Sequence, residues 1–201
     1  MNCLLGSCVL LIFGMFLCGR MEAAVITVTG NTTTGTISNI NTGGTTIDYL
    51  IMSLDQTTTY TFDLLSRDVL SGDAAGGVSK LDTEIFLFEF DAAGDQGLLG
   101  ALVGDNDDAS PFPTVGAADG STASQDSYLS LNLVPGDYVL AISDFAFNEA
   151  EARAGFTTGA LLEGTFGDYQ LTITPAPIPE PASALLFGLG IAGLTIPRRR
   201  R

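Results

Sequence analysis

The chain has 201 residues, a formal net charge of −15 at neutral pH, and neither histidine nor tryptophan. Its three cysteines, Cys3, Cys8 and Cys18, all lie in an apolar N-terminal stretch, and residues 25–174 contain 21 acidic residues against three basic ones. This inventory excludes Cys/His zinc sites, thiol nucleophiles and Ser-His-Asp triads from that segment. Such an acidic surface repels nucleic acid, so we expect no nucleic-acid partner.

The N-terminus has the features of a signal peptide. Residues 3–18 form the apolar run CLLGSCVLLIFGMFLC, which is too short and too early to anchor a protein in a membrane. Small residues at Ala23 and Ala24 follow it and offer a cleavage point. We therefore expect residues 1–24 to be a signal peptide, the mature domain to begin at Val25, and the chain to be exported across the cytoplasmic membrane.

Residues 25–174 have the pattern of an all-β domain. Glycine and aspartate separate short apolar segments, and apolar and polar residues alternate within several of them, as in Tyr128–Leu133. The predicted strands cover residues 25–29, 46–54, 58–65, 84–90, 100–103, 127–133, 137–143 and 169–174. About eight strands in about 150 residues predict one β-sandwich, jelly-roll-like, flanked by the signal peptide and a C-terminal transmembrane sorting helix.

One short helix is expected inside a long connection over residues 145–166. Asn148 is a good N-cap for the run Glu-Ala-Glu-Ala-Arg, and Gly155 is a natural stop. Connections of this length are either functional or mobile, and the sequence does not choose between these.

One acidic turn has the composition of a calcium site. Asp105, Asn106, Asp107 and Asp108 are consecutive, and calcium binds six to eight oxygen ligands from carboxylates and backbone carbonyls. The spacing is not that of an EF-hand, and the alternative is a solvated turn without metal. The candidate calcium ligands, including residues expected across a hairpin from the turn, are Asp82, Asp91, Asp105, Asp107 and Asp108.

The C-terminus predicts a membrane segment behind a stiff spacer. Residues 175–181 form a proline-rich linker, which cannot continue a sheet. The apolar residues 182–197 follow as a transmembrane helix, whose uncharged core of about 15 residues spans about 22 Å, against ~30 Å of hydrocarbon. The final cluster, Arg198, Arg199, Arg200 and Arg201, holds the end of the chain in the cytoplasm and leaves the domain on the outer face.

This tail resembles the PEP-CTERM sorting signal, because Pro179, Glu180 and Pro181, a Gly/Leu-rich helix and an arginine cluster occur in the order of that family. The resemblance covers residues 177–201. It implies a Gram-negative bacterium in which an exosortase cuts near Pro179–Pro181. It also implies a transient attachment to the inner membrane, followed by release to the cell surface or the extracellular space.

The body resembles the pre-peptidase C-terminal β-sandwich domain over roughly residues 47–173. The resemblance rests on Asp82-Thr-Glu-Ile-Phe-Leu-Phe, Asp91-Ala-Ala-Gly, Gly104-Asp-Asn-Asp-Asp, Asp126-Ser-Tyr-Leu and the segment 133–142. It implies an accessory or adhesive module and not a catalyst.

Together these features predict a structural or adhesive protein of the cell surface or exopolysaccharide (biofilm) matrix, not an enzyme, with exopolysaccharide as a further partner. A glycosidase needs a carboxyl pair in a cleft, and the sequence singles out no such pair. The alternative function is a secreted carbohydrate-binding module, which needs exposed aromatic rings such as those of Phe112, Tyr128 or Phe147.

Overall fold

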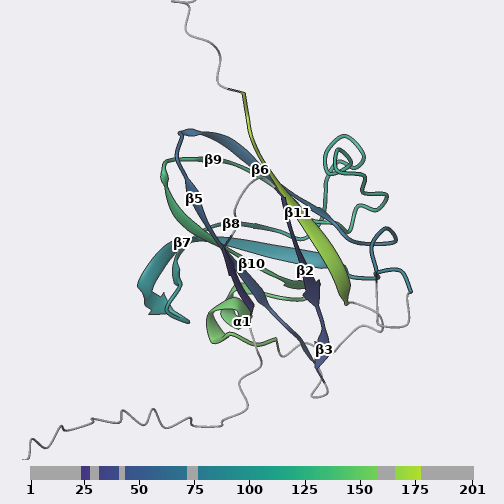
Figure 1. Ribbon diagram of the computed structural model, residues 1–201, viewed down its shortest axis with the longest axis horizontal. Coiled ribbons are helices and arrows are strands. Elements are labelled where there is room, and N and C mark those ends of the chain that lie inside the picture. The colour runs from purple at the N-terminus through teal and green to yellow at the C-terminus, as the bar shows by residue number, and fades with distance from the viewer. Residues whose placement is uncertain (1–23, 28–31, 41–43, 72–76, 158–165, 178–201) are drawn as a thin grey trace, which may run out of the picture.

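The computed structural model describes residues 24–27, 32–40, 44–71, 77–157 and 166–177 (Figure 1). The sorting motif, the membrane segment and nearly all of the expected signal peptide lie outside these residues. Within the described ranges, no helix is long and apolar enough to cross a membrane.

Two stacked sheets form the body, and the predicted β-sandwich is confirmed (Figure 1). One sheet has the order β1-β5-β10-β7-β8, the other has the order β2-β11-β6-β9, and β3 and β4 form a small ribbon. All ladders are antiparallel except that of β1 with β5. The elements are β1 Ala24–Thr27, β2 Thr32–Ile37, β3 Asn39–Ile40, β4 Gly44–Thr45, β5 Asp48–Leu54, β6 Thr58–Leu65, β7 Thr83–Asp95, β8 Leu99–Asn106, β9 Tyr128–Leu133, β10 Gly136–Asp144, α1 Glu149–Ala154 and β11 Gly167–Pro175.

Each predicted strand overlaps one of these elements, whereas β2 was not predicted. Its sequence TTTGTI has one large apolar residue, Ile37, so it lacks the alternation of a half-buried strand. It forms because it pairs with β11 along Gly167–Thr172, which makes it an edge strand of the four-stranded sheet.

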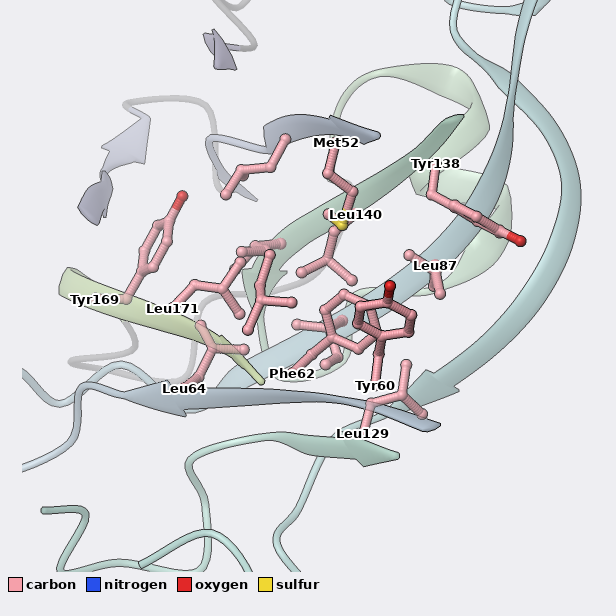
Figure 2. Packing of buried hydrophobic residues seen from close by; sticks show 14 of the residues in the cluster. Met52, Tyr60, Phe62, Leu64, Leu87, Leu129, Tyr138, Leu140, Tyr169 and Leu171 are labelled. Carbon is pink, nitrogen blue, oxygen red and sulfur yellow. The ribbon is translucent and has the colours of Figure 1, made fainter. Parts of the chain in front are cut away.

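The main core lies between the sheets (Figure 2). Alternate residues of each strand point into it, since successive side chains in a strand face opposite sides. Each fully buried large apolar side chain stabilises the fold by roughly 1.5–3 kcal/mol relative to exposure. Among the contributors are Leu50, Met52, Leu87 and Leu140 from one sheet and Phe62, Leu64, Leu129 and Leu171 from the other.

A second core covers the outer face of the five-stranded sheet. Tyr49, Phe86 and Phe88 lie on that face, and Phe147 and Ala152 from the connection after β10 pack against it. The Phe86 and Phe147 rings meet edge to face, with centroids 5.3 Å apart. Residues 145–157 of the long connection therefore serve as a packed cover for the sheet.

The predicted helix and both of its caps are confirmed within this cover. The Asn148 side chain accepts a hydrogen bond from the backbone N–H of Glu151 at 3.1 Å, and Gly155 ends the helix in the left-handed region with φ 79°. Arg153 in the last turn lies 5.0 Å from the centre of the Phe88 ring and pairs with Glu149 at 2.8 Å and Asp95 at 3.0 Å. These contacts hold α1 on the sheet.

A buried tyrosine–carboxylate pair joins the two sheets at one end. The Tyr169 hydroxyl of β11 donates a hydrogen bond of 2.8 Å to Oδ2 of Asp48 on β5, and both residues are buried. Burial raises the pKa of Asp48, and the hydrogen bond from Tyr169 partly opposes this shift. The pair requires glycine at position 35, because a Cβ there would lie 2.3 Å from the Tyr169 hydroxyl oxygen and 2.6 Å from Asp48 Oδ2.

We expect Gly35→Ala to lower the free energy of unfolding by about 1–3 kcal/mol, because neither buried partner has room to move away from the added methyl group. Urea unfolding at neutral pH measures this change. The matched control is Gly136→Ala, another strand glycine whose nearest side-chain atom would lie 3.5 Å away. An unchanged midpoint for Gly35→Ala would show that the pair is not tightly packed.

Candidate functional site

The β7–β8 hairpin brings most of the predicted calcium ligands to one end of the sandwich. In its ladder Phe86 lies opposite Asp105 and Ile85 opposite Asn106, so the start of β7 runs beside the end of β8. This register places Glu84, which precedes Ile85, beside the acidic turn. We call the resulting group the acidic end: Asp82, Glu84, Asp105, Asp107 and Asp108.

Asp91 does not belong to this group. It lies five residues along β7 from Phe86, which corresponds to about 17 Å at the rise of a strand. It is exposed near the tip of the hairpin, where its Oδ1 accepts the backbone N–H of Ala93 at 2.8 Å. Its side chain shapes the local turn, so the structure separates Asp91 from the other four predicted ligands.

Glu84 is the most perturbed carboxyl of the acidic end. Its Oε2 atom is buried and has no hydrogen-bond partner. Burial, followed by the negative charges of Asp107 and Asp105, raises its pKa to about 8. The backbone N–H of Ala146, a residue in the left-handed region with φ 71°, opposes this shift by hydrogen bonding to the carboxylate.

Asp82 has the one cationic partner that the structure describes at this end. Its pKa is raised to about 6, chiefly by burial, while Arg67 lowers it and Asp108 and Asp107 raise it further. The Arg67 Nη1 atom lies 3.6 Å from Asp82 Oδ2, and both side chains are partly exposed. A partly exposed pair of this kind contributes little to stability. Its single cation faces the five carboxyl groups of the acidic end.

Contacts with Ser127 and Tyr128, around the start of β9, hold the acidic turn in place. Ser127 donates through its hydroxyl to the backbone carbonyl of Asp107 at 3.1 Å, and its backbone N–H donates to the Thr83 hydroxyl at 2.8 Å. The Asn106 side chain accepts the backbone N–H of Tyr128 at 3.3 Å. The turn is therefore attached to both sheets.

Sequence reasoning gave no structural role to Asp126, which precedes β9 and is fully buried. Its Oδ1 accepts the backbone N–H of Arg67 at 2.8 Å, and its Oδ2 accepts the Ser121 hydroxyl at 2.6 Å and the backbone N–H of Ser66 at 3.2 Å. Burial raises its pKa and these three bonds oppose the shift. The signal in the sequence was an aspartate directly before an alternating strand, a position typical of a local cap.

The arrangement does not amount to a preformed metal cage. Across the described residues, no group of three or more acidic side chains is positioned to hold a metal ion. Calcium binding by Asp82, Asp105, Asp107 and Asp108 therefore stays a prediction.

The remaining site residues have mixed outcomes. Pro179, Glu180, Pro181 and the four terminal arginines fall outside the described residues. Of the aromatic rings considered for sugar binding, Phe147 is only 2% exposed because it fills the second core, so that expectation was wrong for Phe147. Phe112 and Tyr128 are partly exposed.

Residues 177–201 match the PEP-CTERM protein-sorting motif. No curated protein matches the chain. In Gram-negative bacteria this motif implies an exosortase substrate that is exported to the cell surface and attached to the membrane through its C-terminus before processing.

Three solved structures resemble the chain. The pre-peptidase C-terminal domain of a Bacillus anthracis collagenase has 12% identity and a TM-score of 0.38, over 76% of this chain and 95% of that one. The Aeromonas hydrophila periplasmic inhibitor of g-type lysozyme, PliG, has 15% identity and a TM-score of 0.35, over 76% and 98%. CorA, a surface-associated copper-binding protein of Methylomicrobium album BG8, has 8% identity and a TM-score of 0.39, over 78% and 99%.

We expect Glu84→Gln to stabilise the domain at pH 7.5 by at least about 1 kcal/mol, measured by urea unfolding with a chelator present. The folded pKa of about 8 lies above the ordinary value of 4.5, so the wild type loses stability as the pH rises between these values. The glutamine side chain does not ionise, so the Glu84→Gln variant does not lose stability in this way.

The advantage of Glu84→Gln should vanish near pH 4, where the wild-type side chain is protonated in both states. Glu89→Gln, on the same strand but exposed, is the matched control and should have little effect. A glutamine variant with the same pH profile as the wild type would contradict the buried, repelled state of Glu84.

Proposed function

We propose that the mature domain is a non-catalytic structural or adhesive component of the cell surface or of the exopolysaccharide matrix, and that it reaches this place through its removable C-terminal tail. The observation that carries the proposal is the sorting motif at residues 177–201, directly after the last strand of a folded sandwich. Strand β11 ends at Pro175, and the backbone N–H of Ala176 still bonds to the carbonyl of Thr59 at 2.7 Å. The tail thus follows the domain with little intervening chain.

The chemistry of the domain supports a passive role outside the cell. After removal of the expected signal peptide it would contain no cysteine, so it could form no disulfide in an oxidising environment. Two apolar cores hold it together without disulfides. Its 21 acidic residues keep it soluble, and they favour contact with anionic polysaccharide only where divalent cations bridge the two surfaces.

Weak calcium binding at the acidic end is part of this proposal. The charges of Asp108 and Asp107 help to raise the pKa of Asp82, the charge of Asp107 helps to raise that of Asp108, and Arg67 is the nearby cation. Sites of this openness bind calcium at extracellular, millimolar levels. Such binding would allow the end of the sandwich to share a calcium ion with an acidic sugar chain.

The first test follows the chain in a bacterium that has an exosortase. We expect intact-mass analysis to show a mature chain that has lost its C-terminal tail and is recovered from the surface or matrix fraction. Deletion of the exosortase should leave the full tail and keep the protein in the membrane fraction. Replacing Pro179, Glu180 and Pro181 by alanine should have the same effect, whereas Pro177→Ala should be processed normally.

The second test separates delivery from folding. A chain that ends at residue 177 keeps every described strand, so we expect it to have the same urea midpoint as the full domain but no membrane-linked processing. An unfolded product would contradict the assignment of the tail as a detachable signal. Loss of the protein without any change in matrix cohesion would refute the adhesive role, and tight, specific binding on a glycan array would favour the carbohydrate-binding alternative.

A further inference from the structure

A second group of carboxylates lies outside the acidic end, on the outer face of the four-stranded sheet. Asp63 of β6 points to that face, because its neighbours Phe62 and Leu64 point into the main core. In the ladders it lies opposite Tyr128 of β9 and Thr172 of β11. Nevertheless Asp63 is only 6% exposed, which is unusual for an aspartate on an outer face.

The connection between β8 and β9 covers this carboxylate. The Ser121 hydroxyl oxygen lies 3.1 Å from the carbonyl oxygen of Leu64, the residue after Asp63. The backbone N–H of Ala109 donates to the carbonyl of Ser124 at 2.8 Å, which closes the connection into a compact loop. At Gly116 an added Cβ would lie 3.6 Å from the Cβ of Tyr128, so the loop also lies over the residue opposite Asp63.

Two buried carboxylate oxygens under this loop have no hydrogen-bond partner: Oδ1 of Asp63 and Oδ2 of Asp119. The other oxygen of Asp119 accepts the backbone N–H of Ser121 at 3.0 Å, which fixes its side chain in the loop. Leaving such groups buried and unpartnered costs about 1–3 kcal/mol each, and more when they are charged. Two such oxygens under one loop are therefore free to accept a bound cation or water.

The negative charges around Asp63 favour a cation as its partner. Burial first, and then the negative charges of Asp119 and Asp126, raise its pKa to about 7. Asp126 does not relieve this repulsion, because both of its oxygens already accept hydrogen bonds from Arg67, Ser66 and Ser121. A cation placed between Asp63 and Asp119 would neutralise both carboxylates and would occupy both unpartnered oxygens.

We propose that Asp63 and Asp119 bind a divalent cation, calcium by preference, beneath the loop that joins β8 to β9. Calcium accepts a flexible set of six to eight oxygens, so two carboxylates together with loop carbonyls and water suffice. Magnesium demands a stricter octahedron and gives up its water reluctantly. With only two free carboxylates the site binds at the millimolar levels of calcium that an exported protein meets, and the ion fastens the loop to the sheet.

The experiment is a calcium titration of the melting temperature of the domain, with Asp63→Asn, Asp119→Asn and the control Asp55→Asn, which changes an exposed aspartate between β5 and β6. We expect the wild type and the control to rise by about 3–6 °C at ten times the dissociation constant. Asp63→Asn and Asp119→Asn should each lose the part of this rise that comes from the site beneath the loop. In chelator, Asp63→Asn should melt above the wild type, because it buries no charge.

Asp107→Asn distinguishes this site from the acidic end. It should keep the part of the rise that Asp63→Asn and Asp119→Asn lose. If Asp63→Asn responds to calcium as the wild type does while Asp107→Asn does not, the proposal is overturned and the ion belongs to the acidic end. Neither outcome affects the sorting of the chain, which is tested separately by its processing.

Terbium luminescence gives a direct reading of the site. The chain has no tryptophan, so tyrosine must sensitise a bound terbium ion, and Tyr128 is the tyrosine opposite Asp63. We expect sensitised emission from the wild type that calcium displaces. Tyr128→Phe should lose most of this emission and keep the calcium-dependent rise in melting temperature. Undiminished emission from Asp63→Asn would contradict the proposal.

Discussion

Folding this chain brings several carboxylates into the interior of a domain that has only three basic residues to offer them. Each buried carboxylate must be hydrogen-bonded, protonated or paired with a cation, because an isolated buried charge is too costly to keep. The rest of the architecture can be understood from how each carboxylate meets this requirement.

Some of these carboxylates are satisfied within the protein. Asp126 takes two backbone N–H groups and a hydroxyl, and so ties the loop before β9 to the segment after β6. Asp48 takes the hydroxyl of Tyr169 and so links the two sheets through their interior. These groups act as structural joints, which an exported domain without disulfides needs in addition to its apolar cores.

Others keep an oxygen without a partner. Glu84 faces the acidic turn, and Asp63 faces Asp119 under the β8–β9 loop. Glu84 lies beside the acidic turn that follows β8, and Asp63 lies beneath the connection that leads from that turn to β9. The long connection after β10 differs, because α1 holds it on the sheet by apolar packing and by Arg153.

The features that the sequence predicted well are those encoded over a short span of chain. Short apolar segments between glycine and aspartate, several of them with a period of two, predicted the eight strands, and the caps Asn148 and Gly155 marked the helix. Both signals depend on neighbours within a few residues. The sorting motif is also linear, so the order of Pro179–Pro181, apolar segment and arginines was enough to find it. Composition alone excluded Cys/His zinc sites, thiol nucleophiles and Ser-His-Asp triads from residues 25–174, because that segment has no histidine and no cysteine.

Only the tertiary structure decided which distant residues meet. Asp63 and Asp119 are far apart in the sequence and come together because the β8–β9 connection folds back over β6. Asp91 resembled the other candidate ligands in the sequence, but the length of the hairpin carries it away from Asp105. Phe147 was a candidate surface ring in the sequence, but in the structure it is buried and packs against Phe86. Long-range pairing of strands and loops depends on the packing of the whole domain, and no local pattern of residues encodes it.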